Sequence, residues 1–146
     1  MPRTHRALTR VLLMLLTAVL LATAAGGALA GRKKGAVLDR MMYDYSAAIR
    51  WGDFEGAWTL VDPKEKEKHP MTDLDFSRYQ QIEVTSYREL ATRPGPDGTV
   101  LREIQISLVN RHTLSERSMR YTEVWHFDDK LKTWWIMALP DFWASH

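Results

Sequence analysis

The sequence predicts an α+β fold in which N-terminal helices pack on a curved, four-stranded antiparallel meander sheet, preceded by a hydrophobic leader helix. Apolar residues recur at helical intervals before residue 63 and at strand-like intervals after residue 81. The helical and strand-like segments do not alternate, which argues against a parallel βαβ arrangement. The residues before Gly31 are basic and then apolar, and have the character of a leader.

The first thirty residues have the order of charge and hydrophobicity that is typical of a secretory signal. Three arginines lie within the first ten residues, and the uninterrupted apolar stretch Val11 to Ala25 follows them. The small residues at Ala28-Leu29-Ala30 predict cleavage before Gly31. Alternatively, residues 11–30 form an uncleaved anchor, because this stretch approaches the roughly 20 residues that span a bilayer.

These two interpretations predict different locations for the protein. A cleaved signal places it in the periplasm or outside the cell, whereas an anchor tethers it to the inner membrane by residues 11–30. In both cases the chain divides into residues 1–30 as signal peptide or anchor, residues 31–36 as a linker and residues 37–146 as one folded domain. Contact with the membrane is expected only through residues 1–30.

Charge and composition exclude several functions for the folded domain. The leader arginines account for the net charge of +2, since the residues from Gly31 onward include 17 basic and 18 acidic side chains. A domain without net positive charge lacks the electrostatic footprint of nucleic-acid binding. The chain has no cysteine, which excludes disulfides, thiol nucleophiles and cysteine-ligated zinc.

Two helices are predicted to open the domain. Apolar residues from Leu38 to Ile49 recur every three or four positions and predict an amphipathic helix that ends at Gly52. Asp53 is the expected N-cap of a second helix, which Asp62-Pro63 closes. The next residues, PKEKEKHP, contain nothing to bury and predict a solvated loop over 63–70. A short helical turn is expected over Thr72 to Tyr79.

Four β-favouring segments follow and predict an antiparallel meander. Residues 93–98 and 128–130 have turn chemistry, and the polar link 111–119 is interpreted as a longer, mobile hairpin tip. The aromatic tail, residues 140–143, is expected to pack back onto the sheet; alternatively, it offers an apolar patch to a partner. The predicted strands are Ile82 to Thr92, Thr99 to Asn110, Arg120 to Phe127 and Thr133 to Leu139.

A family resemblance rests on the Trp51-Gly52-Asp53-Phe54 corner between the helices, on Asp62-Pro63 and on a meander that ends YTEVWHFDDKLKTWWIMAL. With this order of elements the chain resembles the nuclear transport factor 2-like superfamily, which includes ketosteroid isomerase, scytalone dehydratase and the polyketide cyclases. The resemblance implies a cystatin-like cone, in which a bent sheet wraps the helices around a cavity. It also implies a homodimer formed through the sheet face. Fold alone assigns no activity on this scaffold.

The same resemblance suggests two catalytic candidates. Tyr43 matches the tyrosine, and Glu123 the strand acid, of the oxyanion hole in ketosteroid isomerase. The base has no counterpart, because Asp62-Pro63 lies too close to the corner and spacing points instead to Glu67 in the charged segment. Without catalysis, Tyr43 is a helix-face aromatic and Glu123 pairs with Arg88 or Arg102 across the sheet.

Metal and cofactor chemistry is not expected from the sequence. The chain contains no catalytic, phosphate-binding or dinucleotide-binding motif. His112 and His126 lie near strands without an acidic residue at ligand spacing, so a metal site would require convergence in the tertiary structure.

The remaining site candidates are residues for a ligand pocket or an interface. Trp134 and Trp135 are adjacent on a strand and must point to opposite faces of the sheet, so one ring lies outside the helix-covered core. That ring is the sequence evidence for a homodimer or for an envelope protein partner. The full set of candidates is Tyr45, Trp58, Trp125, His126, Trp134 and Trp135.

The sequence thus predicts an exported cell-envelope protein with a non-catalytic domain that binds a small apolar ligand or a protein. One alternative is a small-molecule isomerase, lyase or dehydratase that uses Tyr43 and Glu123. Another is a membrane-tethered accessory subunit of an envelope or secretion complex. No cofactor is expected for any of them.

Overall fold

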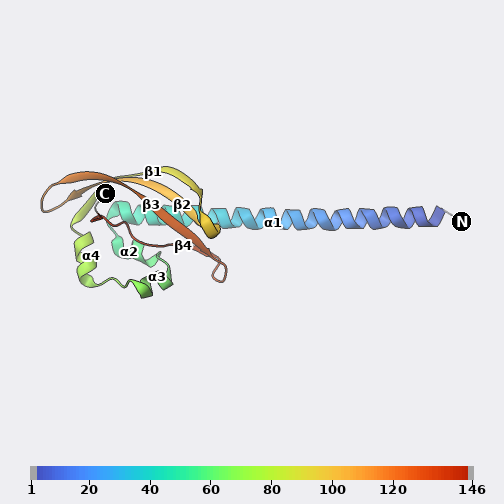
Figure 1. Cartoon of the computed structure of the whole chain (residues 1–146), viewed down its shortest axis with the longest axis horizontal. Helices are drawn as coiled ribbons and strands as arrows, with labels where there is room; N and C mark the ends of the chain where they lie inside the picture. Colours follow the sequence, from blue (N-terminus) through green and yellow to red (C-terminus); the bar gives the residue numbers. More distant parts are fainter. Residues whose placement is uncertain (1–2, 145–146) are drawn as a thin grey trace. The chain divides into compact units, whose positions relative to one another are not determined.

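The computed structural model describes the backbone of residues 3–144 and the side chains of residues 26–144. The chain divides into two compact units, Met1–Ala36 and Val37–His146. Its elements, labelled in Figure 1, are α1 (Arg3–Trp51), α2 (Phe54–Thr59), α3 (Pro63–Lys68), α4 (Asp73–Tyr79), β1 (Ile82–Pro94), the 3-10 helix η1 (Pro96–Gly98), β2 (Val100–Asn110), β3 (Glu116–Asp128) and β4 (Thr133–Ile136).

The predicted leader falls largely outside the residues whose side chains are described. This applies to the apolar stretch Val11 to Ala25, on which both the signal and the anchor interpretations depend. Within the part of the chain that the structure describes, no helix is long and apolar enough to cross a membrane.

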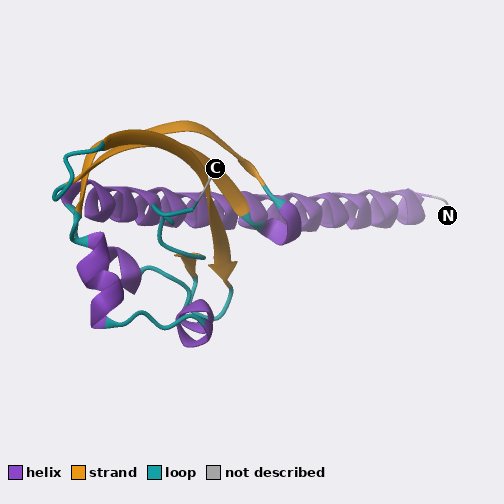
Figure 2. Cartoon of the chain, turned by 60° about the vertical axis from the view of Figure 1, so that its left-hand side comes forward, coloured by secondary structure: helices purple, strands orange, loops and turns teal. Residues whose placement is uncertain are grey.

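The second unit is an α+β domain, which confirms the predicted fold class. Its four strands pair in the order β1-β2-β3-β4, and every pair is antiparallel, as in a meander. The register places Arg102 of β2 opposite Glu123 of β3, and Trp125 of β3 opposite Ile136 of β4. The sheet is open and curves over the C-terminal part of α1 (Figure 2).

The predicted junction between the first two helices is confirmed. Met42, Tyr45 and Ile49 are buried on the face of α1 that packs in the core. Gly52 ends the helix with φ of 72°, a left-handed conformation that glycine adopts without strain. Asp53 then caps α2, because its Oδ1 accepts a hydrogen bond from the backbone N–H of Gly56 at 2.8 Å.

The prediction of a loop over residues 63–70 is wrong, because residues 63–68 form α3. Asp62 caps this helix and accepts hydrogen bonds from the N–H groups of Lys64 (2.6 Å) and Glu65 (3.3 Å), and Pro63 occupies the first turn. Lysine and glutamate favour helices even without an apolar face to bury. None of the helix is buried, so the segment is nevertheless solvated.

The expected mobile tip between β2 and β3 is shorter than the sequence suggests. β3 begins at Glu116, and the Asn110 side chain closes the turn by accepting hydrogen bonds from the N–H groups of His112 (2.9 Å) and Thr113 (3.1 Å). Leu114 adopts φ of 56° in this turn. Residues 116–119 therefore extend strand β3 beyond Arg120, where the β-propensity of the sequence predicts it to begin.

The aromatic tail packs back on the domain, as predicted, but it packs against helices α2 and α4 and not onto the sheet. The Phe142 ring is fully buried and lies 5.8 Å from that of Phe54 and 5.6 Å from that of Tyr79. The Tyr79 hydroxyl donates to the carbonyl oxygen of Pro140 at 2.8 Å. The tail thereby closes the core at the start of α2 and the end of α4.

Candidate functional site

A pocket lies between α1 and the first two strands and has a volume of about 310 Å³. The two sides are joined where Arg50 Nη2 donates to the carbonyl oxygen of Tyr87 (3.2 Å), and the Arg50 guanidinium lies 5.5 Å from the centre of the Tyr87 ring. The pocket is lined by Asp39, Met42, Tyr43, Ser46, Ala47, Arg50, Trp51, Glu89 and Arg102.

The rim of the pocket is aromatic. Tyr43, Ala47 and Trp51 are spaced four residues apart and so share one face of α1. Tyr43 is 73% exposed and Trp51 is 87% exposed, which is unusual for side chains of this size. The small Ala47 lies between them and also lines the pocket.

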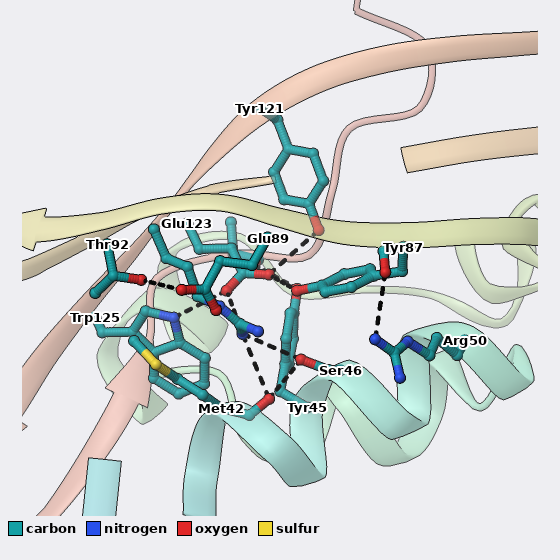
Figure 3. A network of polar contacts seen from close by, with 12 residues as sticks. Met42, Tyr45, Ser46, Arg50, Tyr87, Glu89, Thr92, Tyr121, Glu123 and Trp125 are labelled. Carbon is teal, nitrogen blue, oxygen red and sulfur yellow. Dashed lines mark hydrogen bonds and ion pairs between the residues drawn. The ribbon is translucent and has the colours of Figure 1, made fainter. Parts of the chain in front are cut away.

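The inner end of the pocket borders a buried polar network around Glu123 (Figure 3). The Glu123 carboxylate accepts hydrogen bonds from the hydroxyls of Tyr87 and Tyr121 (3.3 Å) and from the Trp125 indole N–H (3.0 Å). Arg102 Nη1 supplies a fourth donor at 3.3 Å. Burial raises the pKa of Glu123, and these hydrogen bonds and the Arg102 charge only partly offset the effect.

Arg102 connects this network to the pocket. Its Nε donates to Glu89 Oε2 at 2.7 Å and its Nη1 donates to the Ser46 hydroxyl on α1 at 3.1 Å. Glu89 also accepts from the Thr92 hydroxyl (2.8 Å), and this bond, followed by those to Arg102, holds the pKa of Glu89 below its usual range. The guanidinium therefore has a fixed position between α1 and the sheet.

The structure does not bring the two catalytic candidates together. Glu123 is buried, whereas Tyr43 is exposed at the rim of the pocket and is not among the donors that contact the Glu123 carboxylate. Of the two expected partners of Glu123, Arg102 makes the ion pair, and Arg88 instead donates to Gln105 at 2.7 Å. Glu67, the residue nearest the position of the base, is exposed on α3.

Three of the remaining candidates are core residues. Tyr45, Trp125 and Trp134 are buried, and the Tyr45 and Trp125 rings meet edge to face at 5.6 Å. Trp58 is half-buried, with its ring 6.5 Å from that of Phe76. Packing in or against the core therefore explains the positions of all four aromatic side chains.

The other two candidates lie on the outer face of the sheet. Trp135 and His126 are opposite each other in the register of β3 and β4, on the face that Trp134 does not occupy. His126 Nε2 lies 2.7 Å from Asp62 Oδ2, and its Nδ1 lies 3.2 Å from the sulfur of Met137. Met137 carries no sequence signal of its own, since only the tertiary structure places it beside a histidine.

Neither metal ligands nor similarity to known proteins assigns a function to this pocket. Among the side chains that the structure describes, no group of three or more His, Cys, Asp or Glu residues is placed to hold a metal ion. Comparisons with protein-family models and with curated proteins find no match.

Proposed function

We propose that residues 37–146 form a non-catalytic binding domain of the cell envelope, exported by the leader, with the pocket between α1 and β1 as its ligand site. The cone of the nuclear transport factor 2-like superfamily remains part of this proposal. The observation that supports ligand binding is a pocket that joins exposed aromatic rings to fixed charged groups. Sites for small molecules commonly combine apolar walls with a few placed polar groups.

The lining suggests a small amphipathic ligand. The Arg50 guanidinium carries five N–H donors, of which one bonds the carbonyl oxygen of Tyr87, and so it can also bind a carboxylate or carbonyl group. Tyr43 and Trp51 offer ring faces to an apolar or aromatic group. The volume of about 310 Å³ suits a small molecule.

The buried network supports binding without catalysis. Four donors already engage the Glu123 carboxylate, so a role as general base or acid would require it to give up bonds within the core. A substrate would also have to pass Arg102, which contacts both Glu89 and Ser46. We therefore interpret Arg102, which Glu123 holds from behind, as the rigid inner wall of the pocket.

The experiment is a screen of small amphipathic carboxylates by NMR with the full-length protein. Ligands are expected to shift the amide resonances of Tyr43, Ala47 and Trp51, and Arg50→Ala is expected to weaken binding at least tenfold. Arg88→Ala is the matched control, because Arg88 lies on the other face of the sheet, where it contacts Gln105 of β2. Shifts confined to residues outside the pocket, or equal affinity of Arg50→Ala and wild type, would refute the proposal.

The two alternatives are tested separately. An isomerase, lyase or dehydratase that uses Glu123 and Tyr43 should lose turnover in both Glu123→Gln and Tyr43→Phe. A tethered accessory subunit should be recovered uncut from the membrane fraction, whereas export with cleavage gives a soluble species whose intact mass begins at Gly31.

A further inference from the structure

Among the residues that the structure describes, the sheet has one open edge, which belongs to β1. The opposite edge, at β4, is covered by the chain that follows α2. There Ile136 N donates to the carbonyl oxygen of Leu60 (3.2 Å), and Asp62 N donates to that of Ile136 (2.9 Å). β1 comes first in the strand order and pairs only with β2, so alternate backbone groups of β1 point away from the sheet. An edge of this kind can accept a strand from another chain.

The open edge runs beside the proposed ligand pocket. Arg50 Nη2 donates to the backbone carbonyl oxygen of Tyr87 (Figure 3), and the Glu89 side chain lines the pocket from β1. On the other side, the pocket is lined by α1 from Asp39 to Trp51, a stretch of helix that is roughly 18 Å long. An extended peptide advances about 3.3 Å per residue, so this length accommodates about five residues.

The helix and the strand run in opposite directions along the pocket. Arg50, near the end of α1, contacts Tyr87. Ser46, one turn earlier, contacts Arg102 of β2, and the register places Arg102 opposite Thr92 of β1. A peptide whose carboxyl end lies at Arg50 therefore runs from the level of Thr92 toward that of Tyr87. This direction is opposite to that of β1, so the peptide and β1 would form an antiparallel pair.

Arg50 can bind the terminal carboxylate of such a peptide. The residue is exposed and uses one N–H group for the carbonyl oxygen of Tyr87, so its other N–H groups can bind a carboxylate in the bidentate geometry that a guanidinium favours. Trp51, which follows Arg50, is 87% exposed and offers its ring to the last side chain of the peptide. Tyr43, two turns earlier on α1, offers its ring to a side chain further upstream.

The pocket also contains two carboxylates that can attract a basic side chain. The Thr92 hydrogen bond, followed by those to Arg102, lowers the pKa of Glu89, so Glu89 stays ionised, and its side chain is 45% exposed. Asp39 is exposed, and no hydrogen bond or ion pair within the described part of the chain involves it. Both acids lie further from the end of α1 than Arg50 does or on the strand beside it, so they favour a basic residue upstream of the terminal carboxylate.

We propose that the pocket binds the C-terminal segment of an extended peptide, with the terminal carboxylate on Arg50 and the peptide backbone paired antiparallel with the open edge of β1. This inference rests on the proposed function, since it uses the same pocket, and adds the class of ligand. Main-chain hydrogen bonds to the edge supply affinity, and the guanidinium fixes the register of the peptide. Trp51 selects an aromatic last residue, and Glu89 selects a basic residue upstream.

The test is an NMR titration of the isotopically labelled full-length protein with the tetrapeptide Ac-Lys-Ala-Val-Phe and with its C-terminal amide. The free acid is expected to shift the amide resonances of residues 87–93 and to slow hydrogen exchange at the N–H groups of β1 that point away from β2. The amide should bind at least tenfold more weakly, because it lacks the charge that pairs with Arg50. Arg50→Ala should bind both peptides equally. Arg88→Ala, on the outer face of the sheet, should still prefer the acid.

Methylation of the peptide backbone tests the strand pairing without any change to the protein. An added antiparallel strand directs every second N–H group to its neighbour. Methylation of one alternate set of peptide nitrogens should therefore weaken binding at least tenfold, and methylation of the other set should have little effect.

Several results would overturn this inference, and they differ from those that would refute the proposed function. Equal affinity for the acid and the amide, or equal affinity for the two methylated sets, would exclude a C-terminal strand. Slow exchange along β1 that depends on protein concentration, without peptide, would show that the edge of a second copy occupies the site. If small carboxylates bind through Arg50 but the peptide leaves residues 87–93 unshifted, the ligand site stands and the peptide is not its ligand. If neither binds, both proposals are wrong.

Discussion

The Tyr87 hydroxyl donates a hydrogen bond to Glu123, although strand β2 lies between the strands that carry the two residues. The bond therefore joins β1 to β3 on the inner face of the sheet. Arg102 of β2 contacts the same carboxylate and also the Ser46 hydroxyl, so one buried acid connects three strands to α1. The network thereby fixes the sheet relative to the C-terminal part of this helix.

Tyr87→Phe should lower the free energy of unfolding by about 1–3 kcal/mol, because it removes one donor from a buried carboxylate. In a double-mutant cycle with Glu123→Gln, measured by urea denaturation, the two effects should not be additive. Tyr43→Phe is the control, and should change stability by less than about 0.5 kcal/mol since Tyr43 is exposed. Additive effects of Tyr87→Phe and Glu123→Gln would contradict a direct interaction.

Glu123 should also impose a pH dependence on stability. Burial raises its pKa in the folded state, so the folded protein binds this proton more tightly than the unfolded chain does. The stabilising contribution of Glu123 is therefore complete below its ordinary pKa of 4.5 and is lost as the pH rises toward the folded-state value.

The measurement is the stability difference between wild type and Glu123→Gln from pH 4 to pH 8. We expect the advantage of wild type over the variant to shrink as the pH rises. Glu89, whose pKa is lowered by the Thr92 hydrogen bond, has the opposite dependence, but it is present in both proteins and cancels. A difference that grows with pH would show that the charged form of Glu123 is the one that the fold favours.

Gly52→Ala should destabilise the domain by about 1–2 kcal/mol, because Gly52 has φ of 72° and a side chain is strained in this conformation. The added Cβ meets no close atom, since the nearest is Phe54 Cε2 at 3.9 Å, so the cost arises from the backbone alone. Thermal unfolding would detect it. Gly35→Ala, within α1, should instead raise stability by about 0.5–1 kcal/mol. Equal effects at the two positions would contradict this explanation.

Phe142→Ala should lower the free energy of unfolding by about 3–5 kcal/mol, because the ring is fully buried between Phe54 and Tyr79. Chemical denaturation gives the value directly. The neighbouring Trp143 is 37% exposed and lies over the Arg78 guanidinium, so Trp143→Ala should cost less. A larger loss of stability in Trp143→Ala than in Phe142→Ala would show that Trp143, and not Phe142, anchors the tail.

Local signals in the sequence were sufficient to predict much of the fold. The helical and twofold periodicities distinguish helices from strands, and short turns leave an antiparallel meander as the simplest arrangement. Gly52 and Asp53 act through their own backbone and side-chain chemistry, so their roles are readable without tertiary context. Helix α3 was missed because hydrophobic periodicity detects only helices with a buried face, although Asp62-Pro63 is also a helix-starting pair.

The sites could not be predicted in the same way. Tyr87 and Glu123 meet across β2 only in the register that the structure adopts, and that register includes irregularities between Val84 and Ser86 and between Glu89 and Ala91. A shift of one residue would turn either side chain to the other face. Met137 and His126 likewise meet only in the tertiary structure, which single-residue chemistry does not encode.

The hydrogen bond from the Tyr45 hydroxyl to the carbonyl oxygen of Ala138 spans 93 residues and bears on the order of folding. The hairpins of the meander join segments adjacent in sequence, whereas α1 needs the segment after β4 before this contact can form. Closure of so long a loop favours a transition state in which the hairpins are formed and the helix is not yet docked. Loss of the Tyr45 hydroxyl should therefore accelerate unfolding while leaving the folding rate almost unchanged.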